Sequence, residues 1–384
     1  MRLLIATIDY PPIEGGISTL CLQFARACAG LGHEVTVLAP WFPGMESRDA
    51  AEPCRVVRFK GYHSGWLRLL PFLRAAWPLA SGADAIVAVN VAYGGVLGLL
   101  ARARFGIPYL VFAYAYEFLK FQHFLPARLL LRRIYRDAAC TVAISQYTRS
   151  ALLRFGVQER GVRVVYPGAS PKSLPPGQQP ADVRRSLGLG EAPFVLCLGR
   201  FVPRKNHAAL IEAWKQVAVR HPNVHLVMPG RGPTRRICQD LAAALGLSEQ
   251  VLLPGYLDDE SVDTLLSDCL FFALPNSEEA AGHVEGFGLV FAEAAAWGKA
   301  VLAGDSGGAR EAVVDCVTGL LVPPGEPSAL EAALLRLIED SALREQLGKA
   351  GRRRVEETLN WNVFTREVLC SMDDALAARK DGSP

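Results

Sequence analysis

Two glutamates enclose a glycine-rich and apolar stretch, EGFGLVFAE, which begins at Glu285. The pattern is typical of a glycine loop that enters a helix, so backbone N–H groups around Phe287, Gly288 and Leu289 would face an anion. Glu293, about one and a half turns into that helix, could accept hydrogen bonds from two neighbouring hydroxyls, as a ribose offers. Glu285 precedes the loop, where it could contact a sugar. The alternative is a solvated Glu285 and an ordinary helix-face Glu293.

Two cations form a second candidate group, in the stretch LGRFVPRKNH. Arg200 follows an apolar strand pattern, and Lys205 stands before the next helix pattern. Two cations at a sheet edge suit a diphosphate, because they neutralise the charge that develops on a leaving group. The alternative is a pair of solvated surface cations.

Two glycine turns follow strand patterns. Gly15 and Gly16, in YPPIEGGIS, open a helix whose first amides would suit an anion such as a phosphate. Gly230, in MPGRGP, belongs to a tight turn, and the spacing does not decide whether that turn borders a nucleotide. A Gly-Gly pair before a helix is also often a simple turn.

The elements that must position these residues alternate along the whole chain. Short, almost continuously apolar runs are separated by stretches of helical length, which indicates βαβ units and parallel sheets covered on both faces. We expect strands at residues 2–8, 34–40, 84–90, 107–113 and 140–145, with helices at 17–31, 94–105 and 127–138. After the Pro-, Gly- and Ser-rich segment 166–182, we expect strands at 194–200, 224–230, 250–256, 269–275 and 299–305. The fold class is therefore α/β, with two Rossmann-like, doubly wound parallel-sheet domains facing a cleft.

Together these motifs resemble those of retaining glycosyltransferases of the GT-B fold, family 4. Members share a Gly-Gly loop after the first strand, a Gly-Arg…Lys element and a Glu-x7-Glu element in the second domain. Here EGG, GRFVPRK and EGFGLVFAE occur in that order, and the resemblance covers nearly the whole chain. The segment WNVFTREVLCSMDDAL also matches the terminal helix that returns to the N-terminal domain in that fold.

The resemblance implies domain roles and boundaries. Residues 1–168 would form the acceptor-binding domain, 169–180 a linker, 181–358 the nucleotide-sugar-binding domain and 359–384 the returning helix. The implied reaction is the transfer of a hexose from a UDP- or GDP-sugar to a lipid-linked or polysaccharide acceptor in cell-envelope glycan synthesis.

The resemblance also implies roles for single residues. Arg200 and Lys205 would bind the donor diphosphate, Glu285 a hydroxyl of the transferred sugar, and Glu293 the ribose. Further donor contacts are expected from Gly15, Gly16, Gly230, Phe287, Gly288 and Leu289. No cofactor besides the nucleotide-sugar donor is implied. No metal is expected, because cations and helix N-termini would replace it and no Asp-x-Asp occurs in the chain.

One motif departs from the family pattern. Many relatives carry a histidine in a His-Gly-x-Glu element at the end of a strand, and the matching stretch here is FAYAYEF. Tyr114 stands in place of the histidine and Ala115 in place of the glycine, while Glu117 keeps the acid. A neutral phenol can donate one hydrogen bond but is a poor general base near neutral pH. We assign Tyr114 and Glu117 to the acceptor side, where the departing phosphate would take the acceptor proton. The alternative is that Tyr114 and Tyr116 line a pocket or pack in the core.

Positive charge gathers in the first half of the chain. Between Lys60 and Arg136 there are ten Lys and Arg but only two acids. On an ideal helix, four arginines of ARLLLRRIYR fall on one side (Arg128, Arg132, Arg133 and Arg136), and Leu130, Leu131 and Ile134 fall on the other. WLRLLPFLRAAWPL adds Trp66, Phe72 and Trp77 beside Arg68 and Arg74. This composition suits the surface of an anionic membrane, and the alternative is an ordinary helix with a solvated basic face. Nucleic acid is not expected, because no binding motif accompanies the charge.

Composition sets the broad class. The chain has 384 residues, a formal net charge of +3, 51% hydrophobic residues and nine scattered cysteines, which favours two globular domains with reduced thiols. The apolar run near the N-terminus is short and interrupted by Asp9, so we interpret it as a strand and not as a signal peptide. No apolar run reaches the length of a membrane span. We therefore expect a cytoplasmic protein, peripheral on the inner face of the cytoplasmic membrane if the basic helices bind lipid.

Other functions remain open at the level of sequence. A nucleotide-sugar epimerase of the same fold would need catalytic acids and a histidine in the first domain. A glycoside hydrolase would also use two carboxylates, and only their separation in space would settle that. A catalytically weak sugar- or nucleotide-binding relative is a further alternative, because the histidine is missing.

Overall fold

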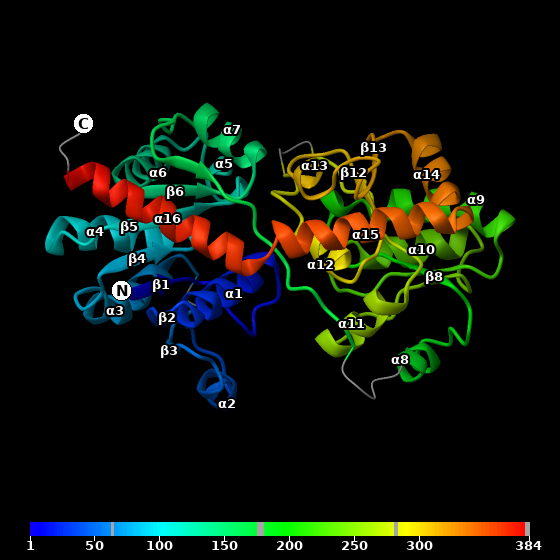
Figure 1. Ribbon diagram of the computed structural model, residues 1–384, viewed down its shortest axis with the longest axis horizontal. Helices are drawn as coiled ribbons and strands as arrows, with labels where there is room; N and C mark the ends of the chain where they lie inside the picture. The colour runs from blue at the N-terminus through cyan, green and yellow to red at the C-terminus, as the bar shows by residue number, and fades with distance from the viewer. Residues whose placement is uncertain (63–64, 175–179, 280–282, 381–384) are drawn as a thin grey trace. The chain divides into compact units, whose positions relative to one another are not determined.

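The computed structural model describes residues 1–62, 65–174, 180–279 and 283–380, in two compact units. The first unit comprises Met1–Pro167 and the segment from Trp361 onward, and the second comprises Gly168–Asn360 (Figure 1). Both are parallel α/β units, which confirms the predicted fold class.

The described residues of the first unit form a seven-stranded parallel sheet with the order β3-β2-β1-β4-β5-β6-β7. Its strands are β1 (Arg2–Ala6), β2 (Glu34–Pro40), β3 (Arg55–Phe59), β4 (Ala85–Ala88), β5 (Tyr109–Ala113), β6 (Cys140–Ala143) and β7 (Val162–Val164). Its helices are α1 (Gly16–Gly30), α2 (Glu46–Ala50), α3 (Leu69–Ala80), α4 (Val96–Phe105), α5 (Tyr116–Leu119), α6 (Leu125–Asp137), α7 (Gln146–Phe155) and α16 (Trp361–Lys380). A 3₁₀ turn, η1 (Gly65–Arg68), precedes α3, and a π-helical turn, η2 (Val91–Gly95), precedes α4.

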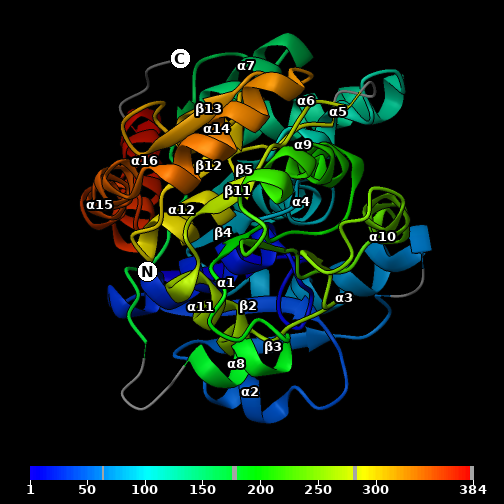
Figure 2. The ribbon, with the colours of Figure 1, turned by 90° about the vertical axis from the view of Figure 1, so that its right-hand side faces the viewer.

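The described residues of the second unit form a six-stranded parallel sheet with the order β10-β9-β8-β11-β12-β13. Its strands are β8 (Phe194–Leu196), β9 (His225–Val227), β10 (Val251–Leu252), β11 (Phe272–Leu274), β12 (Val301–Gly304) and β13 (Gly319–Val322). Its helices are α8 (Pro180–Ser186), α9 (His207–Arg220), α10 (Arg235–Ala244), α11 (Asp259–Asp268), α12 (Leu289–Ala296), α13 (Ala309–Ala312), α14 (Pro327–Glu339) and α15 (Ser341–Glu357), with a 3₁₀ turn, η3 (Pro203–Lys205), before α9. Helix α9 packs against α14, and α12 packs against α15 (Figure 2).

The last helix belongs to the core of the first unit. Helix α16 packs against α1 and β6, as Figure 1 shows. Its Phe364 ring stacks on Phe112 of β5 with centroids 5.8 Å apart, and it meets Phe24 of α1 edge-on at 6.0 Å. Because Phe364 and Phe112 are both fully buried, the C-terminal helix covers one face of this sheet.

The segment predicted as a linker is attached to the second unit over its described part. The Lys172 N–H donates to the Ala296 carbonyl at 3.4 Å, and the Arg352 guanidinium donates to the Lys172 carbonyl at 3.3 Å. Residues 175–179 of that segment lie outside the described residues.

The sequence pattern did not predict strands β3, β7 and β13. All three lie at sheet edges, and β13, although largely buried, is only four residues long. β3 reads RVVRF, with a largely half-buried pattern, and β7 is only three residues long. The central strands β4 and β5 are fully buried and were the easiest to predict.

Candidate functional site

The candidate donor site lies at the carboxyl edge of the sheet in the second unit. In a parallel sheet all strands end at the same edge, so the segments that follow β8, β9, β11 and β12 are brought together there. Arg200 and Lys205 follow β8, Gly230 follows β9, and Glu285 precedes α12. These residues are far apart in the sequence, and the sheet is what gathers them.

Lys205 and Glu285 form the central ion pair of this site. The Lys205 Nζ lies 2.7 Å from Oε2 of Glu285, and the two side chains are only 10% and 15% exposed. The turn η3 positions the lysine: Pro203 begins it, the Lys205 N–H donates to the Val202 carbonyl at 3.0 Å, and Asn206 ends it with a φ of 55°. A buried pair of this kind is expensive to break from one side, because the remaining charge stays uncompensated.

Arg204 is a third cation at this site. Its Nε lies 4.0 Å from Oε2 of Glu285, and its backbone N–H donates to Oε1 of Glu279 at 2.9 Å. Glu279 also pairs with His283 at 3.2 Å. The resemblance identified Arg200 and Lys205 but not Arg204, although the adjacent letters PRK were a signal that a second cation stands beside the lysine.

The cations keep Glu285 ionised. Burial by itself raises the pKa of the Glu285 carboxyl, but Lys205, followed by Arg204 and Arg200, lowers it, and the net pKa lies below its usual value. Arg200 itself is exposed at the edge of the site. Three cations around one glutamate leave a positive excess, which can neutralise a diphosphate while the carboxylate accepts hydrogen bonds from a sugar.

The loop before α12 is held by close backbone packing. The Gly308 N–H donates to the Glu285 carbonyl at 2.9 Å, and a Cβ at Gly308 would lie 2.0 Å from the Gly286 carbonyl oxygen. Gly288 adopts a φ of 90°, and a Cβ there would lie 2.4 Å from the Phe291 ring. Phe287 is buried at 1% exposure and anchors the loop in the core. Loop 285–288 therefore needs glycine both in itself and in the GDSGGARE stretch on which it rests.

Glu293 lies in the second turn of α12, beside an ion pair. Burial raises the pKa of the Glu293 carboxyl, Lys172 opposes this, and Asp263 reinforces it. Lys172 Nζ contacts both carboxyl oxygens of Asp263, at 2.5 and 2.6 Å. The sequence pattern missed Lys172 and Asp263, because they come from distant segments and belong to none of the motifs.

Gly230 packs the end of β9 against the end of β8. It has a φ of 141°, its N–H donates to the Gly255 carbonyl at 2.7 Å, and a Cβ would lie 2.4 Å from the Gly199 carbonyl oxygen. These contacts account for the glycine by packing alone.

In the first unit, Gly15 and Gly16 lie exposed at the start of α1. Gly15 caps this helix with a φ of 142°, and the first turn carries no acidic side chain. The first amides of α1 therefore keep their positive partial charge for an anion.

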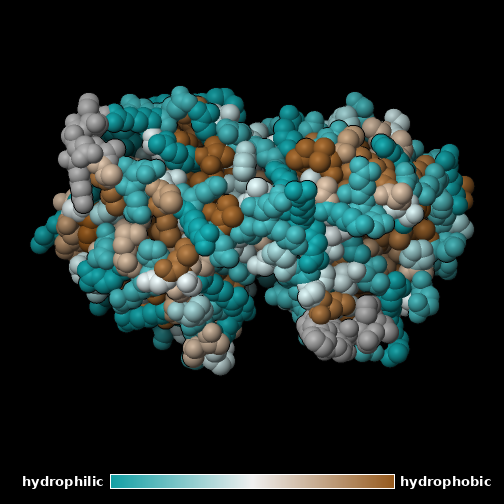
Figure 3. Space-filling view, in the orientation of Figure 1, coloured by the Kyte–Doolittle hydropathy of each residue, from teal (hydrophilic) through white to brown (hydrophobic). Residues whose placement is uncertain are grey.

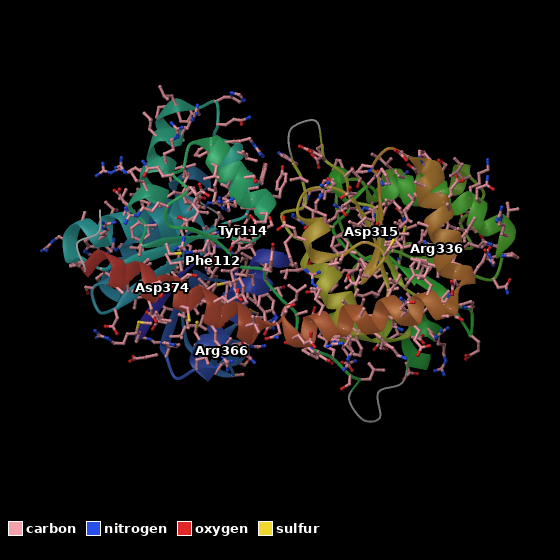
Figure 4. The ribbon with its side chains drawn as sticks, turned by 45° about the horizontal axis from the view of Figure 1, so that its top comes forward. Phe112, Tyr114, Asp315, Arg336, Arg366 and Asp374 are labelled. Atoms are coloured by element: carbon pink, nitrogen blue, oxygen red, sulfur yellow. The ribbon has the colours of Figure 1, made fainter. Side chains whose placement is uncertain are left out.

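Tyr114 and Glu117 are also in the first unit, directly after β5. Figure 4 shows Tyr114 beside Phe112, and their rings stack with centroids 6.4 Å apart. The Tyr114 N–H donates to Oε1 of Glu117 at 2.7 Å. Burial is the main cause that raises the pKa of Glu117, to about 7, against the hydrogen bonds and Lys120, which lower it.

The predicted basic face of α6 is wrong in part: Arg133 and Arg136 are exposed and Leu131 and Ile134 are buried, as predicted, but three other residues differ. Arg128 and Arg132 are half-buried: the Arg132 Nε donates to the Phe155 carbonyl at 2.8 Å, and the Arg128 guanidinium lies 6.0 Å from the Phe155 ring centroid. Leu130, predicted to be on the buried side, is 44% exposed. Long arginine stems pack well against apolar surface, so spacing alone did not identify the buried face.

The exposed surface of this region is apolar and basic instead. Large apolar side chains are exposed on α5, on α6 and just before α6: Tyr116, Phe124, Leu125, Leu129 and Leu130. Arg133, Arg136 and Lys120 are exposed beside them. We call these eight residues the α5–α6 surface. Figure 3 shows hydrophobic patches breaking the hydrophilic surface of the first unit. The side chain of Trp66, predicted to belong to the basic region, lies outside the described side chains.

The described residues offer neither a metal cluster nor a membrane-spanning helix. No group of three His, Cys, Asp or Glu side chains there is arranged to hold a metal ion. None of the helices in that part of the chain combines the length and apolarity of a membrane span.

Two parallel α/β units, with a cation–carboxylate cluster at the carboxyl edge of one sheet, fit the GT-B class of glycosyltransferases that the motifs suggested. The family described as Glycosyl transferases group 1 matches residues 180–354, and the Glycosyl transferase 4-like domain matches residues 15–168. A GDP-mannose-dependent alpha-(1-6)-phosphatidylinositol monomannoside mannosyltransferase of Mycolicibacterium smegmatis is 33% identical over 94% of this chain and 95% of its own. The protein of the same description from Mycobacterium tuberculosis (strain ATCC 25618 / H37Rv) is 31% identical over 98% of this chain and 100% of its own. The chain therefore belongs to the group 1, family 4-like glycosyltransferases, as its motifs predicted.

Solved structures share the fold. The Anabaena protein HepE, in complex with UDP and glucose, has a TM-score of 0.81 at 21% identity, covering 97% of this chain and 100% of its own. Sucrose-phosphate synthase from Thermosynechococcus elongatus has a TM-score of 0.80 at 26% identity, covering 98% and 99%.

Proposed function

We propose that this glycosyltransferase transfers mannose from GDP-mannose to a mannosylated phosphatidylinositol, with retention of the anomeric configuration and without a metal ion. The similarity to mannosyltransferases of that description, at 31–33% identity over nearly the whole chain, supports the donor and the acceptor class. The proposal narrows the broader expectation of a UDP- or GDP-hexose and a lipid-linked or polysaccharide acceptor.

The observation that carries the proposal is the Lys205–Glu285 pair with Arg204 and Arg200 around it. A nucleoside diphosphate sugar offers two charged phosphates next to a ring with several hydroxyls. The cations suit the phosphates, and the ionised Glu285 suits a sugar hydroxyl. The cations would act most strongly as charge develops on the leaving diphosphate.

The remaining donor contacts follow from position in the fold. Glu293 would accept hydrogen bonds from the ribose, and the first amides of α12, near Phe287, Gly288 and Leu289, would face a phosphate. Gly15 and Gly16 would let backbone approach the donor closely, and Gly230 would border the donor from the turn after β9. No metal is required in this scheme, because cations and helix N-termini supply the positive charge.

On the acceptor side, the donor's own diphosphate would take the proton. The attacking hydroxyl of the acceptor loses its proton to the departing phosphate oxygen as the new glycosidic bond forms and the old one breaks on the same face. This route needs no general base from the protein, which fits Tyr114 in place of a histidine. Burial raises the pKa of the Tyr114 phenol well above its usual value, so it stays protonated.

The α5–α6 surface supports a lipid-linked acceptor. Exposed leucines and Phe124 beside Arg133 and Arg136 suit the headgroup region of an anionic membrane, where apolar side chains insert and cations contact the lipid charge. We propose that the reaction takes place at the inner face of the cytoplasmic membrane.

The direct test supplies GDP-mannose and phosphatidylinositol monomannoside, and assigns the new anomeric centre by NMR. An α-linked product, formed equally well with and without EDTA, supports the proposal. A β-linked product would refute retention, and activity abolished by EDTA would refute metal independence. GDP binding without turnover would favour the alternative of a catalytically weak sugar- or nucleotide-binding relative.

A further inference from the structure

The chain leaves β5 through a strained turn at Ala115. This residue has φ 83° and ψ −64°, the geometry of the rare γ-turn that L-residues adopt only under constraint. Ala115 is 2% exposed, and its carbonyl accepts the N–H groups of Phe118 and Leu119 at 3.3 and 3.1 Å. Such strain persists only where the surroundings determine the backbone from more than one side.

Glu117 supplies one of these constraints. Its Oε1 accepts the Tyr114 N–H at 2.7 Å, from the residue just before the strained position. The Tyr135 hydroxyl, from α6, approaches the same oxygen at 3.5 Å. The carboxylate therefore links the end of β5 to α5 and α6 across the turn.

The Tyr114 phenol belongs to the residue just before this turn. This hydroxyl is buried and has no hydrogen-bond partner among the described residues, and an unpaired buried hydroxyl is unfavourable. Tyr114 also lies at the carboxyl end of a central parallel strand, where ligands bind in open α/β sheets. A hydroxyl group of a glycan would satisfy the phenol.

We propose that Glu117 is a positioning residue for the transfer reaction: it holds the Ala115 turn, and the turn presents the Tyr114 phenol to a hydroxyl of the acceptor glycan. The inference rests on the proposed function and adds a residue-level account of acceptor binding. The phenol binds and orients the acceptor and takes no proton.

The first test measures whether Glu117 holds the Ala115 turn, and it does not depend on enzyme activity. Hydrogen exchange of the peptide spanning 113–119 should be faster in Glu117→Ala by at least about tenfold, because the Tyr114 amide loses its acceptor. Glu117→Gln keeps an oxygen that can accept this N–H, so its exchange should stay close to wild type. An unchanged exchange rate in Glu117→Ala would show that Glu117 does not hold the turn.

The second test measures transfer from GDP-mannose to phosphatidylinositol monomannoside. Glu117→Ala and Tyr114→Phe should each lower kcat/KM for the acceptor at least about tenfold, and the double variant should lose little more, since both act through one contact. Ala115→Gly combined with Glu117→Ala should recover part of the loss, because glycine adopts this turn without strain. The matched control is Glu46→Ala, an exposed glutamate of the same unit.

GDP affinity separates this inference from the proposed function. The Kd of GDP, measured by calorimetry, should stay within about twofold of wild type in every variant. The positioning role would be overturned if the losses of kcat/KM were additive in the double variant, or if Tyr114→Phe kept the wild-type kcat/KM. A loss of GDP affinity that parallels the loss of kcat/KM would also overturn it. A wild-type protein that binds no GDP would refute the proposed donor. The hydrogen-exchange result on Glu117 and the Ala115 turn would remain valid.

Discussion

At the residue scale, the account depends on buried charges with defined partners. Lys205, Arg204 and Arg200 lower the pKa of Glu285 by more than burial raises it, so Glu285 stays ionised. Burial raises the pKa of Glu117 by more than its hydrogen bonds and Lys120 lower it. Two glutamates of one chain thus have pKa values shifted in opposite directions by their surroundings. This difference could not be predicted from the sequence, since it depends on which distant side chains pack around each carboxyl.

Replacing Lys205 with Ala should lower kcat by about 100-fold, the usual effect of removing one preorganised group that stabilises developing charge. GDP affinity should fall much less, because Arg200 and Arg204 remain. Steady-state kinetics and calorimetry measure the two effects, with Lys215→Ala, an exposed lysine of α9, as the control. An unchanged kcat would remove Lys205 from the mechanism.

Glu117 should make stability depend on pH. Its folded pKa of about 7 lies above the unfolded value, so its contribution to stability is fully present below pH ~4.3 and is lost as pH rises through about 7. Glu117→Gln cannot ionise, so its unfolding free energy relative to wild type should rise by up to about 3 kcal/mol between pH 4.5 and 8.5.

Urea unfolding at both pH values tests this, with Glu46→Gln as the control. The groups facing Glu117 are Lys120 just after α5, Tyr135 on α6 and the Tyr114 amide after β5. A difference between variant and wild type that does not change with pH would contradict the raised pKa.

At the element scale, the glycine-to-helix transition before α12 was predicted, but its cause was not. The sequence suggested exposed amides, whereas the structure shows that Gly288 is also required by φ and by the Phe291 ring. The face of α6 was predicted wrongly only at Arg128, Arg132 and Leu130, because spacing places residues around a helix without saying which side the rest of the fold covers. Arg128 and Arg132 flank the buried stripe of Leu131, Ile134 and Tyr135, and their guanidinium groups contact Phe155.

Gly288→Ala should destabilise the protein by more than the strain of a positive φ would cause alone. A Cβ at Gly288 meets the Phe291 ring at 2.4 Å, while Gly325, with a φ of 83°, has no atom within 4 Å of its Cβ position. We expect Gly325→Ala to cost about 1 kcal/mol of unfolding free energy and Gly288→Ala about 2–4 kcal/mol. Equal losses in urea unfolding would mean that the ring moves aside without penalty.

The α5–α6 surface should bind anionic vesicles. Leu129→Ser with Leu130→Ser should weaken binding to phosphatidylinositol-containing liposomes at least about tenfold, because two exposed apolar side chains can no longer insert. Val219→Ser, on the exposed face of α9, is the matched control. Flotation of the wild-type protein with neutral vesicles only, or equal flotation of all variants, would contradict this surface.

At the scale of the whole molecule, the alternation of apolar runs and helices was enough to predict two parallel α/β units, because buried central strands leave a strong pattern. Edge strands β3, β7 and β13 left a weak one. The motifs named Lys205 and Glu285 as donor-site residues, and the structure brings these two together. It also places Arg204 near Glu285, and the Lys172–Asp263 pair near Glu293, contacts that depend on sheet order. The ion pair between Lys205 and Glu285, which are eighty residues apart, likewise depends on the order of the strands in the sheet.

The most direct measurement of the central claim is thermal and urea stability with GDP, UDP and ADP side by side. At about 100 times its dissociation constant, GDP should stabilise the protein by roughly 2.7 kcal/mol, with little effect of the other two. The GDP effect should be lost in Glu293→Ala. Stabilisation by none of the three, or a GDP effect that survives Glu293→Ala unchanged, would contradict the donor site proposed for the second unit.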